Sequence, residues 1–76
     1  MSSIEIFPGI ITDPEILGGE AIVKGTRIPV ALILGHLAAG MSTEEIEYEY
    51  DLSIENIRAA LGYAAKRIGE EAIGVK

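Results

Sequence analysis

The sequence predicts a mainly α fold, in which a three-helix, homeodomain-like helix-turn-helix core follows short N-terminal β-strands or a hairpin. Three observations lead to this fold class. Residues 1–29 contain all three prolines and a Gly-Gly pair, a composition typical of strands and turns. From residue 30 onward, apolar residues recur at helical spacing, and glycine or serine divides the run into three segments. A length of 76 residues leaves room for one domain, with strands and turns over 1–29 and a three-helix bundle over 30–76.

Short strands separated by turns are expected in the first 29 residues. Ile4-Glu5-Ile6 alternates apolar and acidic side chains, as a strand with one buried face does. Asp13-Pro14 is a turn or helix-start signal, because aspartate caps and proline presets φ. Gly18-Gly19 separates two apolar runs and is predicted to be a two-residue hairpin turn. Gly25-Thr26 is predicted to be a second turn.

The first helix is expected from about residue 30 to residue 39. One face repeats apolar residues at helical spacing: Val30, Ile33, Leu34 and Leu37. The other sides are apolar as well, through Ala31, Leu32 and Ala38, which predicts a helix at the buried centre of the domain. Gly40 ends it, because glycine takes the left-handed conformation at a helix end. His36 lies within this helix and is predicted to be a partly buried core or interface residue.

The second and third helices are predicted from their caps and their periodicity. Ser42, with Glu45 three residues later, forms the capping box of a helix over about 43–50. Ser53 caps the third helix, and Glu55 lies near its positive end. The apolar positions of the third helix, expected to face inward, are Ile54, Ile57, Leu61, Ala64 and Ile68.

The small size and the apolar composition predict a homodimer. A core of this size stabilises a chain by only a few kcal/mol, so small domains often depend on disulfides, a metal or a partner. The chain has no cysteine and one histidine, so we expect neither disulfides nor a metal or cofactor. With 49% hydrophobic residues, an interface between two copies is the remaining support.

No membrane association is expected. No apolar run reaches the roughly 18 residues that a membrane-spanning helix needs. The first residues, Met-Ser-Ser-Ile-Glu, lack the basic region of a secretory signal, so we expect a cytoplasmic protein.

Acidic residues gather on the predicted second helix. The net charge of −6 opposes binding to nucleic acid by bulk charge. Between Ser42 and Glu55 there are six acids and no base. Five of these acids are candidate contacts to a basic partner: Glu44, Glu45, Glu47, Glu49 and Asp51. The alternative is a solvated helix face, which is what most charge runs are.

The predicted third helix is weakly cationic, with three bases and no acid between residues 56 and 68. Five of its residues have the chemistry for contacts to DNA bases or phosphates: Asn56, Arg58, Tyr63, Lys66 and Arg67. Ala59 and Gly62, expected on the outward face, would let a DNA groove or a partner helix approach closely. The alternative is a surface helix with ordinary charges, and the acidic second helix disfavours DNA because it would cross near the phosphates.

The segment Lys24-Gly25-Thr26-Arg27 does not match a phosphate-binding loop, which needs Gly-x-x-x-x-Gly-Lys-Ser/Thr between a strand and a helix. We predict instead that Gly25, Thr26 and Arg27 form a structural turn motif, with Arg27 in an ion pair. The lack of cysteine and the single histidine leave no nucleophile–base pair, so we expect no enzymatic activity.

Several short motifs occur in order over about residues 10–66. They are Ile11-Thr12-Asp13-Pro14, Gly19-Glu20-Ala21-Ile22, Gly25-Thr26-Arg27-Ile28-Pro29-Val30, Leu37-Ala38-Ala39-Gly40-Met41-Ser42, Glu45-Ile46 and Ile57-Arg58-Ala59-Ala60-Leu61-Gly62-Tyr63-Ala64. These blocks resemble the family called domain of unknown function 433. The chain departs from the family pattern at Ala21, where proline is common, and at Tyr50-Asp51-Leu52, where the family has Tyr-Pro-x-Leu.

The resemblance implies a small helix-turn-helix-like domain with a short N-terminal β part, and it brings no catalytic residues. The family is similar to proteins regarded as antitoxins, which are often encoded beside a PIN-like ribonuclease toxin. The first hypothesis is therefore a non-enzymatic regulator of a toxin–antitoxin system, a homodimer that binds a PIN-like toxin and operator DNA. The alternative is a dimeric protein-interaction module without DNA binding.

Overall fold

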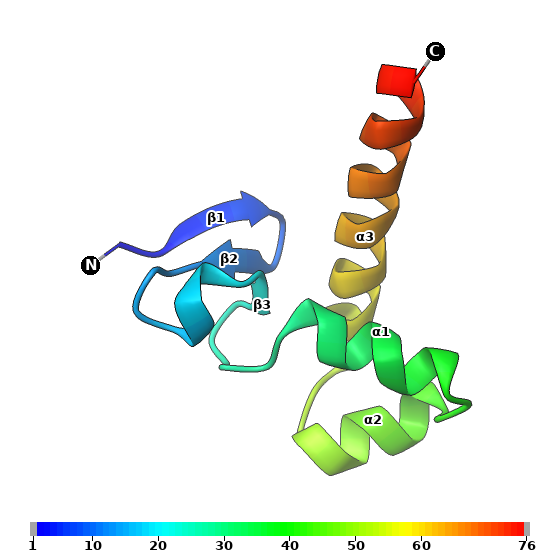
Figure 1. The fold of residues 1–76 in the computed structure, drawn as a ribbon. Helices are drawn as coiled ribbons and strands as arrows, with labels where there is room; N and C mark the ends of the chain where they lie inside the picture. The colour runs from blue at the N-terminus through cyan, green and yellow to red at the C-terminus, as the bar shows by residue number, and fades with distance from the viewer. Residues whose placement is uncertain (1, 76) are drawn as a thin grey trace.

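An antiparallel sheet of three short strands lies beside three helices in the computed structural model, which describes residues 2–75 and the side chains of residues 2–70 (Figure 1). In chain order the elements are β1 (Ile4–Phe7), β2 (Ile10–Thr12), the 3₁₀ turn η1 (Leu17–Gly19), β3 (Ile22–Val23), α1 (Val30–Ala38), α2 (Thr43–Tyr50) and α3 (Ile54–Val75). The fold therefore combines the three predicted helices with a small sheet. None of the helices is long and apolar enough, over the described residues, to cross a membrane.

The hairpin of the sheet joins β1 to β2 through Pro8-Gly9, not at Gly18-Gly19 as predicted. Gly9 has φ +86°, and its N–H donates to Glu5 Oε2 over 2.8 Å. Gly18 and Gly19 instead belong to η1, in which the N–H of Gly19 donates to the Ile16 carbonyl over 3.0 Å. The prediction was wrong because a Gly-Gly pair supplies positive φ to a tight 3₁₀ turn as readily as to a hairpin.

The Gly25-Thr26 turn is confirmed, and it fixes the sheet to α1. The Thr26 hydroxyl donates to the Val23 carbonyl over 2.8 Å and accepts from the Ile28 N–H over 3.0 Å. The Val23 N–H donates back to the Ile28 carbonyl over 3.0 Å. The chain therefore doubles back on β3 and enters α1 directly.

The helix boundaries follow the predicted caps. Gly40, at φ +99°, ends α1. The Ser42–Glu45 capping box is present, with the Glu45 N–H 3.1 Å from Ser42 Oγ and the Ser42 N–H 2.8 Å from Glu45 Oε1. Asp51 takes the left-handed conformation after α2, and Ser53 caps α3 by accepting the N–H of Asn56 over 3.1 Å. These contacts span three residues or fewer, which is why the sequence alone predicts them.

The core lies where α1, α2 and α3 meet the sheet. Its buried residues are Ile10, Ile22, Val23, Val30, Ile33, Ile46, Leu52, Ile57 and Ala60. α1 is not buried on all sides, as was predicted from its composition, because Ala31, Leu32 and Ala38 are exposed. Only the face that carries Val30 and Ile33 reaches the core.

Candidate functional site

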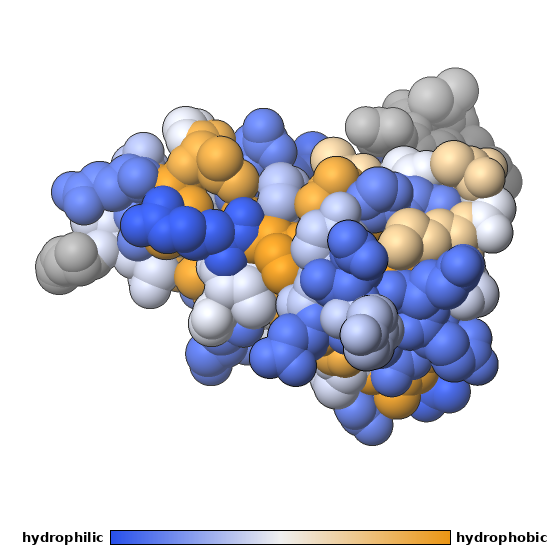
Figure 2. Space-filling view, turned by 90° about the horizontal axis from the view of Figure 1, so that it is seen from below, coloured by the Kyte–Doolittle hydropathy of each residue, from blue (hydrophilic) through white to orange (hydrophobic). Residues whose placement is uncertain are grey.

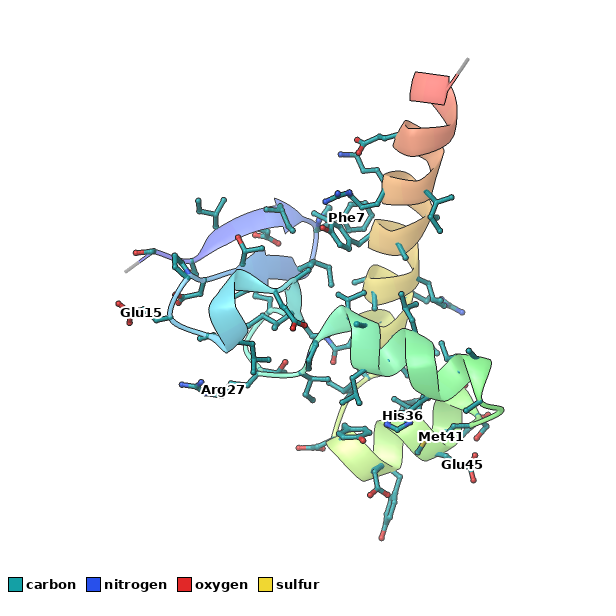
Figure 3. The ribbon with its side chains drawn as sticks, in the orientation of Figure 1. Phe7, Glu15, Arg27, His36, Met41 and Glu45 are labelled. Carbon is teal, nitrogen blue, oxygen red and sulfur yellow. The ribbon has the colours of Figure 1, made fainter. Side chains whose placement is uncertain are left out.

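The small residues of α3 receive the β1–β2 hairpin of the same chain. A Cβ on Gly9 would lie 3.1 Å from the Ala59 Cβ, and a Cβ on Gly62 would lie 3.1 Å from the Phe7 ring. The Phe7 side chain points from the hairpin toward α3 and meets Tyr63 edge to face, with ring centroids 6.1 Å apart (Figure 3). Ala59 and Gly62 were predicted to face outward toward a partner. They do allow a close approach, but their neighbour is the chain's own hairpin.

The side of α3 opposite the hairpin is buried at Ile57 and becomes open further along the helix. Leu61 is 43% exposed and Ile68 is 65% exposed, although both were predicted to face inward. Of the other positions predicted to face inward, Ile57 is fully buried, and Ile54 and Ala64 are half-buried. Beyond Ile57, apolar residues continue at the spacing i, i+3, i+4, i+7, with Ala64 half-buried and the other three exposed. We call this row the α3 apolar stripe: Leu61, Ala64, Ala65 and Ile68.

A shallow groove of about 360 Å³ adjoins the α3 apolar stripe. Ala64 and Ile68 belong to both features. The lining residues are Glu20, Ala21, Val30, Ala31, Leu34, Tyr63, Ala64, Arg67 and Ile68. α1 and α3 supply most of these side chains, so the groove is apolar, with one acid and one base. Such a surface suits another polypeptide better than a polar small molecule.

The five residues predicted to bind DNA do not share one face. Arg58 and Arg67 are nine residues apart, about two and a half turns, and so lie on opposite sides of α3. The Asn56 side chain accepts the Ser53 N–H over 2.9 Å and therefore completes the helix cap. Arg67 Nη1 donates to the Tyr63 hydroxyl over 3.1 Å. Lys66 forms an ion pair with Glu70, with Nζ 3.3 Å from Oε2.

The five acids predicted to bind a partner are brought together by α2 and its end. Glu44, Glu45, Glu49 and Asp51 are exposed, and Glu47 is half-buried. The Tyr48 ring lies among them and is 90% exposed. Seen from below, the side on which α2 lies in Figure 1, the surface over this part of the molecule is largely hydrophilic (Figure 2). We call this region the acidic α2 surface.

The inner side of α2 is joined to α1 by a polar contact. His36 Nε2 lies 2.7 Å from the Tyr50 hydroxyl, and the two rings stack with centroids 5.5 Å apart. His36 and Met41 lie between the two helices in Figure 3. The prediction of a partly buried histidine within the structure is confirmed, and its partner, Tyr50, could not be named from the sequence.

Arg27 projects from its turn into solvent (Figure 3). The expected ion pair of Arg27 is not formed: among the side chains of residues 2–70, the salt bridges join Lys24 to Glu5 and Lys66 to Glu70. The Gly9 N–H and then the Lys24 ammonium hold the pKa of Glu5 below its ordinary value of 4.5. Among the described residues, no group of three or more His, Cys, Asp or Glu side chains is placed to hold a metal.

Comparisons with known proteins agree on one family. The sequence model described as "Protein of unknown function (DUF433)" matches residues 10–64. The chain is similar to an uncharacterized protein, y4eO, of Sinorhizobium fredii (strain NBRC 101917 / NGR234), with 43% identity over 56 residues, which are 72% of this chain and 25% of that protein. It therefore spans about a quarter of the length of this relative.

The fold is also similar to a solved structure. A crystal structure of a DUF433 member protein from Anabaena variabilis (ATCC 29413) superposes with a TM-score of 0.75 at 28% identity, over 82% of this chain and 62% of that one.

Proposed function

The chain belongs to the DUF433 family, and from that premise we propose that it is a small, non-enzymatic regulatory protein that acts by binding another protein, as an antitoxin binds its toxin. The observation that carries the proposal is the acidic α2 surface, with the exposed ring of Tyr48 at its centre. Tyrosine is enriched at the energetic centres of interfaces. A tyrosine that is 90% exposed, on a helix that also carries four glutamates, fits a partner that presents arginine or lysine, since the ring face attracts cations.

A PIN-like ribonuclease is the partner class that this surface favours, because a protein that binds RNA carries a basic surface. Opposite charges would speed and orient the association of the two proteins. The antitoxin role itself comes from the family resemblance. The charge and the exposure of α2 support it.

The test is binding to the small PIN-like ribonuclease encoded beside the gene, measured by calorimetry at low and at physiological salt. We expect a complex that weakens with salt, and a loss of roughly tenfold or more in affinity for Tyr48→Ala. Glu15→Gln, an exposed glutamate away from α2, is the matched control and should bind like the wild type. A complex that is insensitive to Tyr48→Ala, or the lack of a PIN-like neighbour, would contradict the proposal.

Operator DNA is the second candidate ligand, and the geometry of α2 and α3 favours it. Two helices joined by the three residues 51–53, with a left-handed residue in the turn, follow the plan of a helix-turn-helix unit. A homeodomain-like core would present α3 to the major groove. The acids of α2 would then lie near the phosphates and oppose binding.

A fluorescence titration with DNA from the region upstream of the gene separates the two candidates. If α3 binds DNA, the double change Arg58→Ala with Lys66→Ala should weaken binding and reduce the salt slope by about two. An unchanged affinity and an unchanged salt slope would exclude DNA binding by α3, and protein binding would remain as the candidate function.

A further inference from the structure

We propose that the α3 apolar stripe is the interface of a homodimer, in which the α3 helices of two copies pack antiparallel. This inference is independent of the proposed function, because it concerns the protein alone. The stripe is an apolar helix face that the described chain leaves largely open: Leu61 is 43% exposed, Ile68 is 65% exposed, Ala65 is exposed and Ala64 is half-buried. In Figure 1, the end of α3 extends past the sheet and the other helices.

The order of side chains along the stripe makes it its own complement. Leu61 and Ile68 lie at its ends, and Ala64 and Ala65 lie in the middle. A two-fold axis between Ala64 and Ala65 places Leu61 of one copy opposite Ile68 of the second copy, twice. The two alanines let the helix backbones approach closely at the centre, while the larger residues fill the space on either side.

Charge favours the antiparallel orientation of the two helices. The acids concentrate on α2 and its end, and residues 51–53 join α2 directly to the start of α3. Antiparallel packing places the two acidic α2 surfaces at opposite ends of the pair. Parallel packing would instead place the two acidic α2 surfaces side by side, in a chain of net charge −6.

The groove beside the stripe completes the contact. Its floor is apolar and is shared by α1 and α3, through Ala31, Leu34 and Ala64. An antiparallel second α3 centred on the stripe would lie beside this groove along its middle turns, because the two-fold axis sets residues 61–66 of one copy opposite residues 63–68 of the other. Burial there would remove from water the apolar surface that a small core leaves uncovered.

Sedimentation equilibrium of the purified protein tests the interface. We expect the wild type to be a dimer at tens of micromolar and Ile68→Glu to raise the dissociation constant by roughly 100-fold or more, because each dimer loses two apolar contacts and gains two buried charges. Ile4→Glu is the matched control, since Ile4 is 63% exposed but lies in β1. Circular dichroism would confirm that both variants keep their helices.

A wild-type monomer, an Ile68→Glu dimer or equal dissociation of Ile4→Glu would overturn the proposal. The orientation is tested by mixing two variants, Leu61→Glu and Ile68→Lys. Each alone should be monomeric, and the mixture should form a heterodimer, because only antiparallel helices place the new glutamate opposite the new lysine. A mixture that stays monomeric would overturn the antiparallel arrangement.

Discussion

The two long faces of α3 have similar small residues but different neighbours. On one face, Ala59 and Gly62 lie against Gly9 and Phe7. A Cβ on Gly9 would lie 3.1 Å from the Ala59 Cβ, and a Cβ on Gly62 would lie 3.1 Å from the Phe7 ring, so there is no space for a larger side chain. On the other face, the half-buried Ala64 and the exposed Ala65 lie between the exposed residues Leu61 and Ile68, beside a groove shared with α1. Small residues on a helix therefore indicate that another backbone comes close, but they do not say whether it belongs to the same chain.

The comparison also separates stability from association. The covered face holds the hairpin on the helical core, so changes there should unfold the domain. The open face contributes little to the fold of a single copy, so changes there should alter binding to a second molecule. Substitutions of similar size on the two faces can therefore be compared directly.

The largest difference is expected between Ile57→Ala and Leu61→Ala. Ile57 is fully buried, so its truncation should cost about 3 kcal/mol of unfolding free energy through lost burial and a cavity. Leu61 is 43% exposed, so Leu61→Ala should cost less than about 1 kcal/mol in a single copy. Chemical denaturation at several protein concentrations measures both effects. The Ile57 effect should not depend on concentration. Equal losses for the two variants would contradict the difference in burial between these two positions, which lie one turn apart on α3.

Because a domain this small could unfold outright on Ile57→Ala, Ile57→Val is the milder variant. It should cost about 1 kcal/mol, which remains measurable. The order of the three variants, with Ile57→Ala lowest in stability, is the expected result.

A substitution at the hairpin probes the covered face itself. Gly9→Ala should destabilise the domain by about 2 kcal/mol, because it combines a positive φ of +86° with a Cβ 3.1 Å from that of Ala59. In an Ala59→Gly background the steric part disappears and the backbone part remains. A double-mutant cycle should therefore give a coupling of about 1 kcal/mol. A coupling near zero would mean that the hairpin does not rest on Ala59.

The two tyrosines of α2 allow a similar comparison on another helix, between a side chain that contacts α1 and one that is exposed to solvent. Tyr50→Phe removes the hydroxyl that lies 2.7 Å from His36 Nε2 and should cost about 1 kcal/mol. Tyr48→Phe should have no measurable effect on unfolding, because that side chain is 90% exposed. Thermal unfolding of the two variants side by side checks this. A loss for Tyr48→Phe equal to that for Tyr50→Phe would contradict the contact between α1 and α2.

The parts of this molecule that follow from local signals could be predicted from the sequence. Caps at Ser42, Ser53 and Gly40 act within a few residues, so the helices fall where they were expected. The inward face of α3 was predicted correctly near its start, where Ile57 is fully buried, but not at Leu61 and Ile68, which are exposed. Periodicity gives the direction in which a side chain points, but not how far along the helix other elements reach to cover it.

The candidate surfaces were predictable to a different degree. The acids of α2 could be assigned to one surface, because consecutive acids on a short exposed helix stay near one another. The candidate DNA contacts of α3 could not be assigned to one surface, because Arg58 and Arg67 lie on opposite sides of the helix and the Asn56 side chain completes the helix cap.

The Pro8-Gly9 pair is the sequence signal for the hairpin that the prediction missed, because Pro-Gly is a strong turn dipeptide between two strand-like runs.

The smallest expected effect concerns the outer edge of the hairpin, where Glu5 accepts the Gly9 N–H and pairs with Lys24 over 3.2 Å. These contacts lower the pKa of Glu5 in the folded protein below 4.5. The group therefore stabilises the fold above the unfolded pKa, and this contribution is lost as the pH falls through the lower, folded pKa. Glu5→Gln should flatten the decline in stability below about pH 4.5, since its amide does not titrate. Unfolding measured across the acid range compares this variant with Ile4→Ser, which leaves the carboxylate in place. Equal acid sensitivity of Glu5→Gln and the wild type would show that the exposed hairpin edge, unlike the face of α3 beneath it, adds nothing to the stability of the fold.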